Sequence, residues 1–203
     1  FVINGPLTDR IGGKKAILIG AGGSLVMNAA MGFITHSIVA DGPAASGYAA
    51  DLTVIFSVLY AINMYFQSFG AVAIVKVNAP WFHVRERGVF GAIFGVLISL
   101  GIYFAFDWGY KIMGAFGLEH VFFAPAALLT VFWVIVAFVV KDTPGEAGHD
   151  DFDTADASSG DDGPRLGAVA VFKLMLRNPI ILTIAFIEFC SGFLRQAIMQ
   201  WFR

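Results

Sequence analysis

Charged side chains are scarce in this chain. Asp, Glu, Lys and Arg make up 14% of its 203 residues, whereas hydrophobic residues make up 58%. A soluble domain carries nearer a quarter of charged residues. The single cysteine, Cys190, excludes a disulfide framework. The four histidines lack metal-ligand spacing, and no nucleophile stands with a base, so neither an enzyme nor a cofactor is expected. The Lys and Arg residues flank the apolar segments and form no patch, so nucleic acid is not expected as a partner.

Long apolar runs are abundant instead, and the mean hydropathy is +0.75. A helix needs about 20 apolar residues to cross the hydrocarbon core of a bilayer. Five segments meet this length, and the first four contain no Asp, Glu, Lys or Arg. The sequence therefore predicts an all-α membrane protein, a bundle of five transmembrane helices embedded in lipid. The five segments are Ala16–Val39, Leu52–Val75, Gly88–Phe106, Val121–Val140 and Pro179–Phe202.

The basic residues between these segments predict the topology. Residues 1–15, 76–87 and 141–177 would lie on one side of the membrane and hold ten of the 13 Lys and Arg. The opposite loops, 40–51 and 107–120, hold only one. Because cytoplasmic loops carry the excess of Lys and Arg, residues 1–15, 76–87 and 141–177 are expected in the cytoplasm. We expect a multi-pass protein of the plasma (inner) membrane.

The second segment carries a polar stripe. Tyr60, Asn63 and Gln67 are spaced by three and four residues, which places them on one side of a helix. Amides facing lipid are costly unless they are hydrogen-bonded. The stripe is therefore either a set of interhelical hydrogen bonds or the wall of a substrate cavity.

The last segment alone contains formal charges, Glu188 and Arg195. Their seven-residue separation places both on one face of a helix, about two turns apart. Charged residues inside membrane spans normally face a cavity or a partner. Because guanidinium binds phosphate and carboxylate through two parallel hydrogen bonds, Arg195 suggests an anionic substrate, and Glu188 is a candidate for proton coupling. The alternative is that each pairs with a polar group on another helix.

Residues 141–177 differ in composition from the rest. They contain eight of the 15 acidic residues, interleaved with Ser, Gly and Pro. This composition predicts a flexible, solvated linker. The stretch from Lys173 to Arg177 predicts a short helix ahead of Asn178-Pro179, where the last span begins.

The N-terminal basic segment carries a recognisable motif, Gly, three residues, Asp, Arg, one residue, Gly and then basic residues. Gly5, Asp9, Arg10, Gly12 and Lys14 match it, as does Lys15. The segment resembles the signature loop between helices two and three of major facilitator superfamily transporters. The resemblance implies a cytoplasmic latch, in which Asp9 and Arg10 pair across the two halves of the protein and Gly5 permits close helix contact.

Three further stretches resemble the organophosphate:phosphate antiporter family, which includes glycerol-3-phosphate and hexose-6-phosphate transporters. Residues 192–201 (GFLRQAIMQW) resemble its seventh helix, on which an Arg binds the phosphoryl group, and Arg195 falls on that Arg. Asp142-Thr143-Pro144 resembles the start of its central loop. Residues 66–88 resemble its fourth helix and the following loop. Glu188 departs from the family pattern, which has an amide there.

These resemblances imply an internal fragment covering helices three to seven of a twelve-helix transporter. Residues 1–140 would belong to the N-terminal half, 141–177 to the central linker and 178–203 to the first helix of the C-terminal half. The implied activity is exchange of an organic phosphate for inorganic phosphate by alternating access, by a protein that is monomeric at full length. The substrate-binding residues would be Arg195 and Glu188 with the polar stripe. The alternatives are a proton-coupled carrier of another organic anion and a transporter-like sensor of sugar phosphates.

Overall fold

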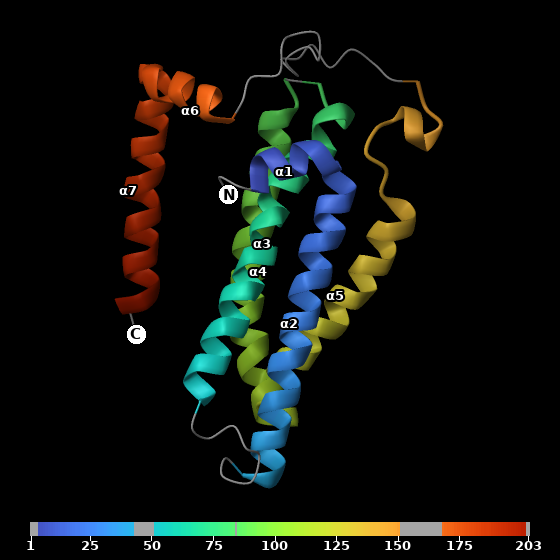
Figure 1. Ribbon diagram of the computed structural model, residues 1–203, viewed down its shortest axis with the longest axis vertical. Helices are drawn as coiled ribbons and strands as arrows, with labels where there is room; N and C mark the ends of the chain where they lie inside the picture. Colours follow the sequence, from blue (N-terminus) through green and yellow to red (C-terminus); the bar gives the residue numbers. More distant parts are fainter. Residues whose placement is uncertain (1–3, 43–50, 84, 151–167, 202–203) are drawn as a thin grey trace. The chain divides into compact units, whose positions relative to one another are not determined.

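The computed structural model describes residues 4–42, 51–83, 85–150 and 168–201. All regular structure within these ranges is helical (Figure 1). Five helices are long and apolar enough to cross a membrane, and each overlaps one of the five predicted segments. The predicted all-α membrane fold is therefore confirmed.

The chain divides into two compact units, Phe1–Ser158 and Ser159–Arg203. The first contains α1 to α5 with two short 3₁₀ helices, and the second contains α6 and α7. In chain order the elements are α1 Asn4–Ile11, α2 Gly13–Asp41, α3 Leu52–Asn78, η1 Ala79–Trp81, α4 Arg87–Phe116, α5 His120–Val139, η2 Gly145–Ala147, α6 Ala168–Arg177 and α7 Pro179–Trp201.

Helix α2 is the centre of the first unit, because it packs against both α3 and α5. Its glycines lie where large residues of those helices approach. A Cβ at Gly20 would stand 2.9 Å from the backbone oxygen of Phe66, and the Phe66 ring packs directly over Gly23. A Cβ at Gly32 would stand 2.7 Å from the ring of Phe123. The glycine-rich α2 is therefore a surface for close helix packing.

Helix α5 is also fastened to α2 by a hydrogen bond. The indole Nε1–H of Trp133 donates to the backbone oxygen of Leu18 at 2.9 Å. Gly22 makes room for the indole, since a Cβ there would stand 3.2 Å from Trp133 Nε1. Buried or lipid-facing indoles need such a partner for their N–H group.

Helix α4 contrasts with α2, since none of its residues is buried. It continues to Phe116, ten residues past the predicted end at Phe106, so the expected loop over 107–120 is wrong for most of its length. A 30-residue helix is about 45 Å long, whereas the hydrocarbon core is about 30 Å thick. The additional turns bear Asp107 and Lys111, whose side chains form an i,i+4 ion pair at 2.8 Å. These two charges thus belong to the polar end of a long helix.

The N-terminal segment expected as a loop is also mostly helical. Helix α1 lies crosswise over the ends of α2 and α3 (Figure 1). It ends where Gly12 adopts a φ of 90°, a conformation that favours glycine, and α2 begins at the next residue. Gly12 therefore supplies the sharp change of direction between α1 and α2.

In the second unit α6 runs crosswise to α7 (Figure 1). The side-chain Oδ1 of Asn178 accepts a hydrogen bond from the backbone N–H of Ile180 at 3.0 Å, and Pro179 occupies the first position of α7. Both are start signals of a helix. The short helix predicted over residues 173–177 is confirmed as the second half of α6. Much of the predicted flexible linker, residues 151–167, lies outside the described residues.

Candidate functional site

The signature segment, residues 5–15, is held by an ion pair to α3. Lys76 Nζ donates to Asp9 Oδ1 at 2.8 Å and to the backbone oxygen of Asp9 at 3.3 Å. Asp9 is therefore paired within the first unit. The predicted pairing across two halves stays a prediction.

A second contact joins the signature segment to the start of the predicted linker. Asp142 Oδ1 accepts a hydrogen bond from the backbone N–H of Lys14 at 2.6 Å, at the first turn of α2. That turn has N–H groups without partners in the helix and favours a negative charge. Asp142 thus caps α2, although it lies 128 residues after Lys14 in the sequence.

The two glycines before Lys14 fit this contact sterically. A Cβ at Gly12 would stand 3.2 Å from Asp142 Oδ2, and one at Gly13 would stand 2.5 Å from the Val77 side chain. Gly13 is the position at which the signature motif usually has a basic residue. Here the space for such a residue is taken by Val77 and Asp142.

The remaining latch residues have more open surroundings. Arg10 is exposed, and a Cβ at Gly5 would meet nothing within 4 Å. Within the described chain neither is needed for packing. Their role in the latch stays a prediction.

Sequence reasoning missed two buried polar residues of α1. Asn4 donates through Nδ2 to Ser68 Oγ of α3, and Thr8 is fully buried one turn later. Asn4 Oδ1 and Thr8 Oγ1 are buried without a hydrogen-bond partner among the described residues. Their i,i+4 spacing marks the face of α1 that packs on α3, a signal that was available once this segment was treated as a helix.

The polar stripe of α3 is divided between the interior and the surface. Asn63 is buried and accepts a hydrogen bond through Oδ1 from Gln67 Nε2 at 3.2 Å. Tyr60 and Gln67 are exposed. Asn63 therefore uses its side-chain oxygen within α3, and Tyr60 and Gln67 remain available to line a cavity.

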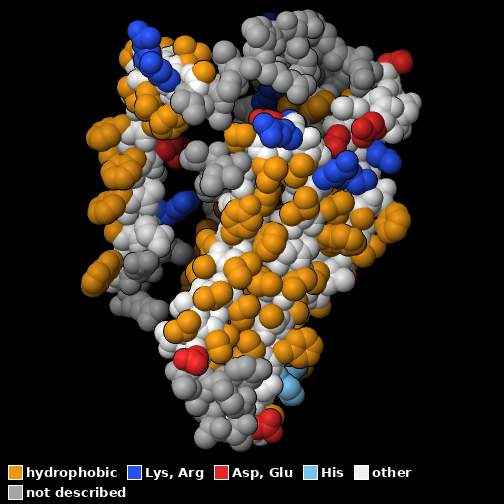
Figure 2. All heavy atoms as spheres, viewed as in Figure 1, with side chains coloured by type: hydrophobic (Ala, Val, Ile, Leu, Met, Phe, Trp, Pro, Cys, Tyr) orange, Lys and Arg blue, Asp and Glu red, His pale blue; other side chains and the backbone are white. Residues whose placement is uncertain are grey.

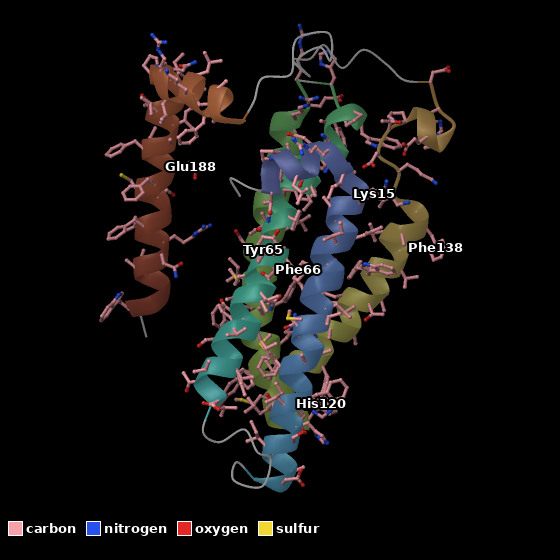
Figure 3. All side chains as sticks on the ribbon, in the orientation of Figure 1. Lys15, Tyr65, Phe66, His120, Phe138 and Glu188 are labelled. Atoms are coloured by element: carbon pink, nitrogen blue, oxygen red, sulfur yellow. The ribbon has the colours of Figure 1, made fainter. Side chains whose placement is uncertain are left out.

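On α7, Glu188 and Arg195 are both exposed (Figure 3 labels Glu188). Neither takes part in a salt bridge with any residue that the structure describes. Both residues belong to the second unit, whereas the polar stripe of α3 belongs to the first. Their role as a substrate site remains a prediction from the sequence.

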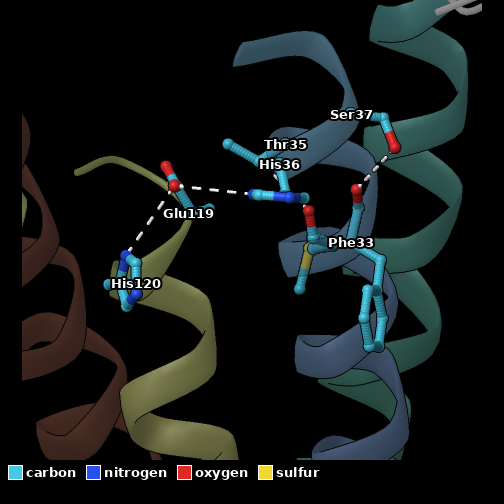
Figure 4. Close-up of polar contacts among 7 residues, drawn as sticks. Phe33, Thr35, His36, Ser37, Glu119 and His120 are labelled. Atoms are coloured by element: carbon cyan, nitrogen blue, oxygen red, sulfur yellow. Dashed lines mark hydrogen bonds and ion pairs between the residues drawn. The ribbon is translucent and has the colours of Figure 1, made fainter. Parts of the chain in front are cut away.

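Another polar cluster, made of His36, Glu119 and His120, joins α2 to the start of α5 (Figure 4). Glu119 Oε1 lies 3.6 Å from His36 Nδ1 and 3.8 Å from His120 Nδ1. The hydrogen bond from its own backbone N–H, with a smaller contribution from His36, holds the pKa of Glu119 below its usual 4.5. The cluster was missed because His36 and Glu119 are 83 residues apart, and neither carries a motif.

Five apolar helices, a capped signature segment and two charges on α7 define a polytopic helical membrane protein. Residues 1–202 match the family model of the Major Facilitator Superfamily. The chain therefore belongs to this superfamily, and membership points to a transporter rather than an enzyme.

One curated relative is similar to this chain. It is the glycerol-3-phosphate transporter of Bacillus subtilis (strain 168), 24% identical over 170 residues. The match covers 75% of this chain and 36% of the relative, so the chain spans about a third of that protein's length. No solved structure matches.

Proposed function

We propose that this chain forms part of a secondary active transporter that exchanges an organic phosphate, such as glycerol-3-phosphate, for inorganic phosphate by alternating access. Arg195 carries the proposal. It is a permanently charged guanidinium within a predicted span, and it has no salt-bridge partner among the described residues. The similarity to a glycerol-3-phosphate transporter supports the choice of a phosphate-bearing substrate.

The mechanism places an anion site near the middle of the membrane, between two halves that rock around it. Arg195 binds two phosphate oxygens through its planar fork, and Tyr60 and Gln67 line the cavity on α3. The signature segment acts at the membrane surface. The hydrogen bond from the Lys14 N–H group to Asp142 links α2 to the start of the linker, so α2 and the start of the linker move together.

The test replaces Arg195 by Lys in the full-length protein. Lysine keeps the positive charge but loses the two-point geometry, so phosphate exchange in proteoliposomes should fall about tenfold or more, as for loss of a charge-assisted hydrogen bond of roughly 1.5–3 kcal/mol. Arg85→Lys is the matched control, since Arg85 is exposed and outside the spans. Unchanged exchange with Arg195→Lys would remove the main support for a phosphate substrate.

A second candidate is a proton-coupled carrier of another organic anion, favoured by Glu188 on the same helix as Arg195. Carboxyl groups within membrane spans mark proton relays in many pumps and transporters. In such a carrier Glu188→Gln would abolish proton-driven accumulation of the anion and spare its exchange for the same anion. The antiporter predicts little effect on either activity. A sugar-phosphate sensor would instead bind the substrate without moving it across the membrane.

We also propose that the protein lies in the plasma (inner) membrane, with residues 1–15, 76–87 and 141–177 in the cytoplasm. The charge distribution along the sequence supports this orientation. Asp150→Cys in a Cys190→Ser background should react with a membrane-impermeant maleimide only when the cytoplasmic side is open. Reaction in intact cells would show that the orientation is the reverse of the proposed one. Monomers are expected for the full-length protein.

A further inference from the structure

Helix α6 has two different faces. Lys173 and Arg177 are spaced by four residues and lie on one side. Phe172, Met175 and Leu176 have the i, i+3, i+4 spacing of another side, and all three are exposed within the second unit. The ten residues of α6 contain no acidic side chain that could neutralise the two cations.

The position of α6 follows from its connection to α7. Only Asn178 separates α6 from α7, whose predicted span begins at Pro179. The change of direction at this junction sets α6 crosswise to the span (Figure 1). A helix that runs crosswise at the end of a span lies along the membrane surface, at the depth of the lipid headgroups. Basic side chains gather at this end of the second unit, above the hydrophobic side chains of α7 (Figure 2).

We propose that α6 is an interfacial helix that binds anionic phospholipid. Lys173 and Arg177 contact the headgroup phosphates, while Phe172, Met175 and Leu176 insert among the first methylene groups of the acyl chains. The surface of an anionic leaflet supplies the charge that complements the two cations. Insertion of the apolar side removes from water three large side chains that are 44% to 56% exposed.

This arrangement fixes the end of the linker at the membrane. A lipid-bound α6 defines the height and direction at which the chain enters α7. The proposal concerns the bilayer and does not depend on which substrate the protein transports.

The first experiment measures the depth of α6. Single cysteines replace residues 172–177 one at a time in the full-length Cys190→Ser protein, each carrying a spin label. The protein is reconstituted in vesicles of equal parts phosphatidylcholine and phosphatidylglycerol. Labels at 172, 175 and 176 should collide more with oxygen than with a water-soluble nickel complex, and labels at 173 and 177 should show the reverse. Uniform exposure to nickel would overturn the proposal, as would shielding of all labels from both reagents, which indicates packing against protein.

The second experiment tests the charge. The label stays at Leu176→Cys, and the ratio of membrane-inserted to free α6 is read from the two components of its spectrum. Each cation near an anionic surface strengthens binding about fivefold, so Lys173→Gln with Arg177→Gln should lower the ratio on the order of 20-fold. Lys141→Gln, a neutralised exposed lysine in the first unit, is the control and should leave the ratio unchanged.

A lipid series keeps the test independent of how the double variant folds. In the labelled protein without charge substitutions, pure phosphatidylcholine should lower the ratio relative to the mixed vesicles. Equal ratios in both lipids would overturn recognition of the anionic headgroup, even if the depth pattern of the labels is as expected.

Discussion

Helices α2 and α4 are similar in length, apolar and glycine-rich, yet α2 has buried residues and α4 has none. On α2, glycines such as Gly20 face the backbone and rings of neighbouring helices. On α4, a Cβ at Gly91 or Gly95 would meet nothing within 4 Å, and no α4 residue is buried. Composition alone therefore does not reveal which small residues are packed. The difference in burial arises because α3 and α5 pack closely against α2 and leave α4 exposed.

The largest effect is expected from a methyl group added to each helix. Gly20→Ala would place a Cβ 2.9 Å from the Phe66 oxygen, a backbone atom that cannot move aside, so unfolding should become easier by about 1–3 kcal/mol. Gly95→Ala is the matched control and should be neutral or slightly stabilising, because alanine is the better helix former. The thermal unfolding midpoint in detergent measures both. An equal loss with Gly95→Ala would show that α4 is packed in the full-length protein.

A smaller effect is expected from loss of the cap on α2. Asp142→Ala removes the acceptor of the Lys14 N–H group and should cost about 0.5–2 kcal/mol of unfolding free energy. The control is Asp150→Ala, an exposed acid in the same segment. Denaturant midpoints of the two variants should differ in the direction of a less stable Asp142→Ala. Equal midpoints would show that the contact adds nothing to stability.

Acid should weaken the junction of α2 and α5. Because folding lowers the pKa of Glu119, its carboxylate contributes stability above pH 4.5, and this contribution is lost as the pH falls through the lowered folded-state value. His36 from α2 and His120 from α5 face the carboxylate. Glu119→Gln should therefore reduce the fall in the unfolding midpoint between about pH 6 and pH 3. An identical acid response in both proteins would show that Glu119 is not responsible.

The smallest effect is expected from the ion pair between Asp9 and Lys76. Both side chains are substantially exposed, so Asp9→Asn should cost only about 0.2–1 kcal/mol, and less at high salt. The salt dependence of the unfolding midpoint measures this contribution. If transport falls far more than stability, Asp9 has a partner in the transport cycle besides Lys76, as the latch prediction requires.

The sequence was sufficient for the five spans, because their length and lack of charge are direct requirements of the bilayer. It was insufficient at their ends. Asp107 and Lys111 lie in the stretch that was predicted as a loop, but they pair along a helix that continues beyond the apolar core. The site showed the same limit. The stripe on α3 was visible from its spacing, whereas the contacts of Asp142 with Lys14 and of Glu119 with His36 join residues far apart in sequence and follow only from helix packing.

The bond between Trp133 and Leu18 has an optical consequence. The indole is the fluorophore whose emission responds most to its hydrogen bond and to the polarity around it, and here that bond crosses from α5 to α2. A protein in which Trp81, Trp108 and Trp201 are replaced by Phe would retain one tryptophan within the described chain, placed at this junction. Its spectrum would report whether the two helices stay together while the transporter turns over, without any added dye.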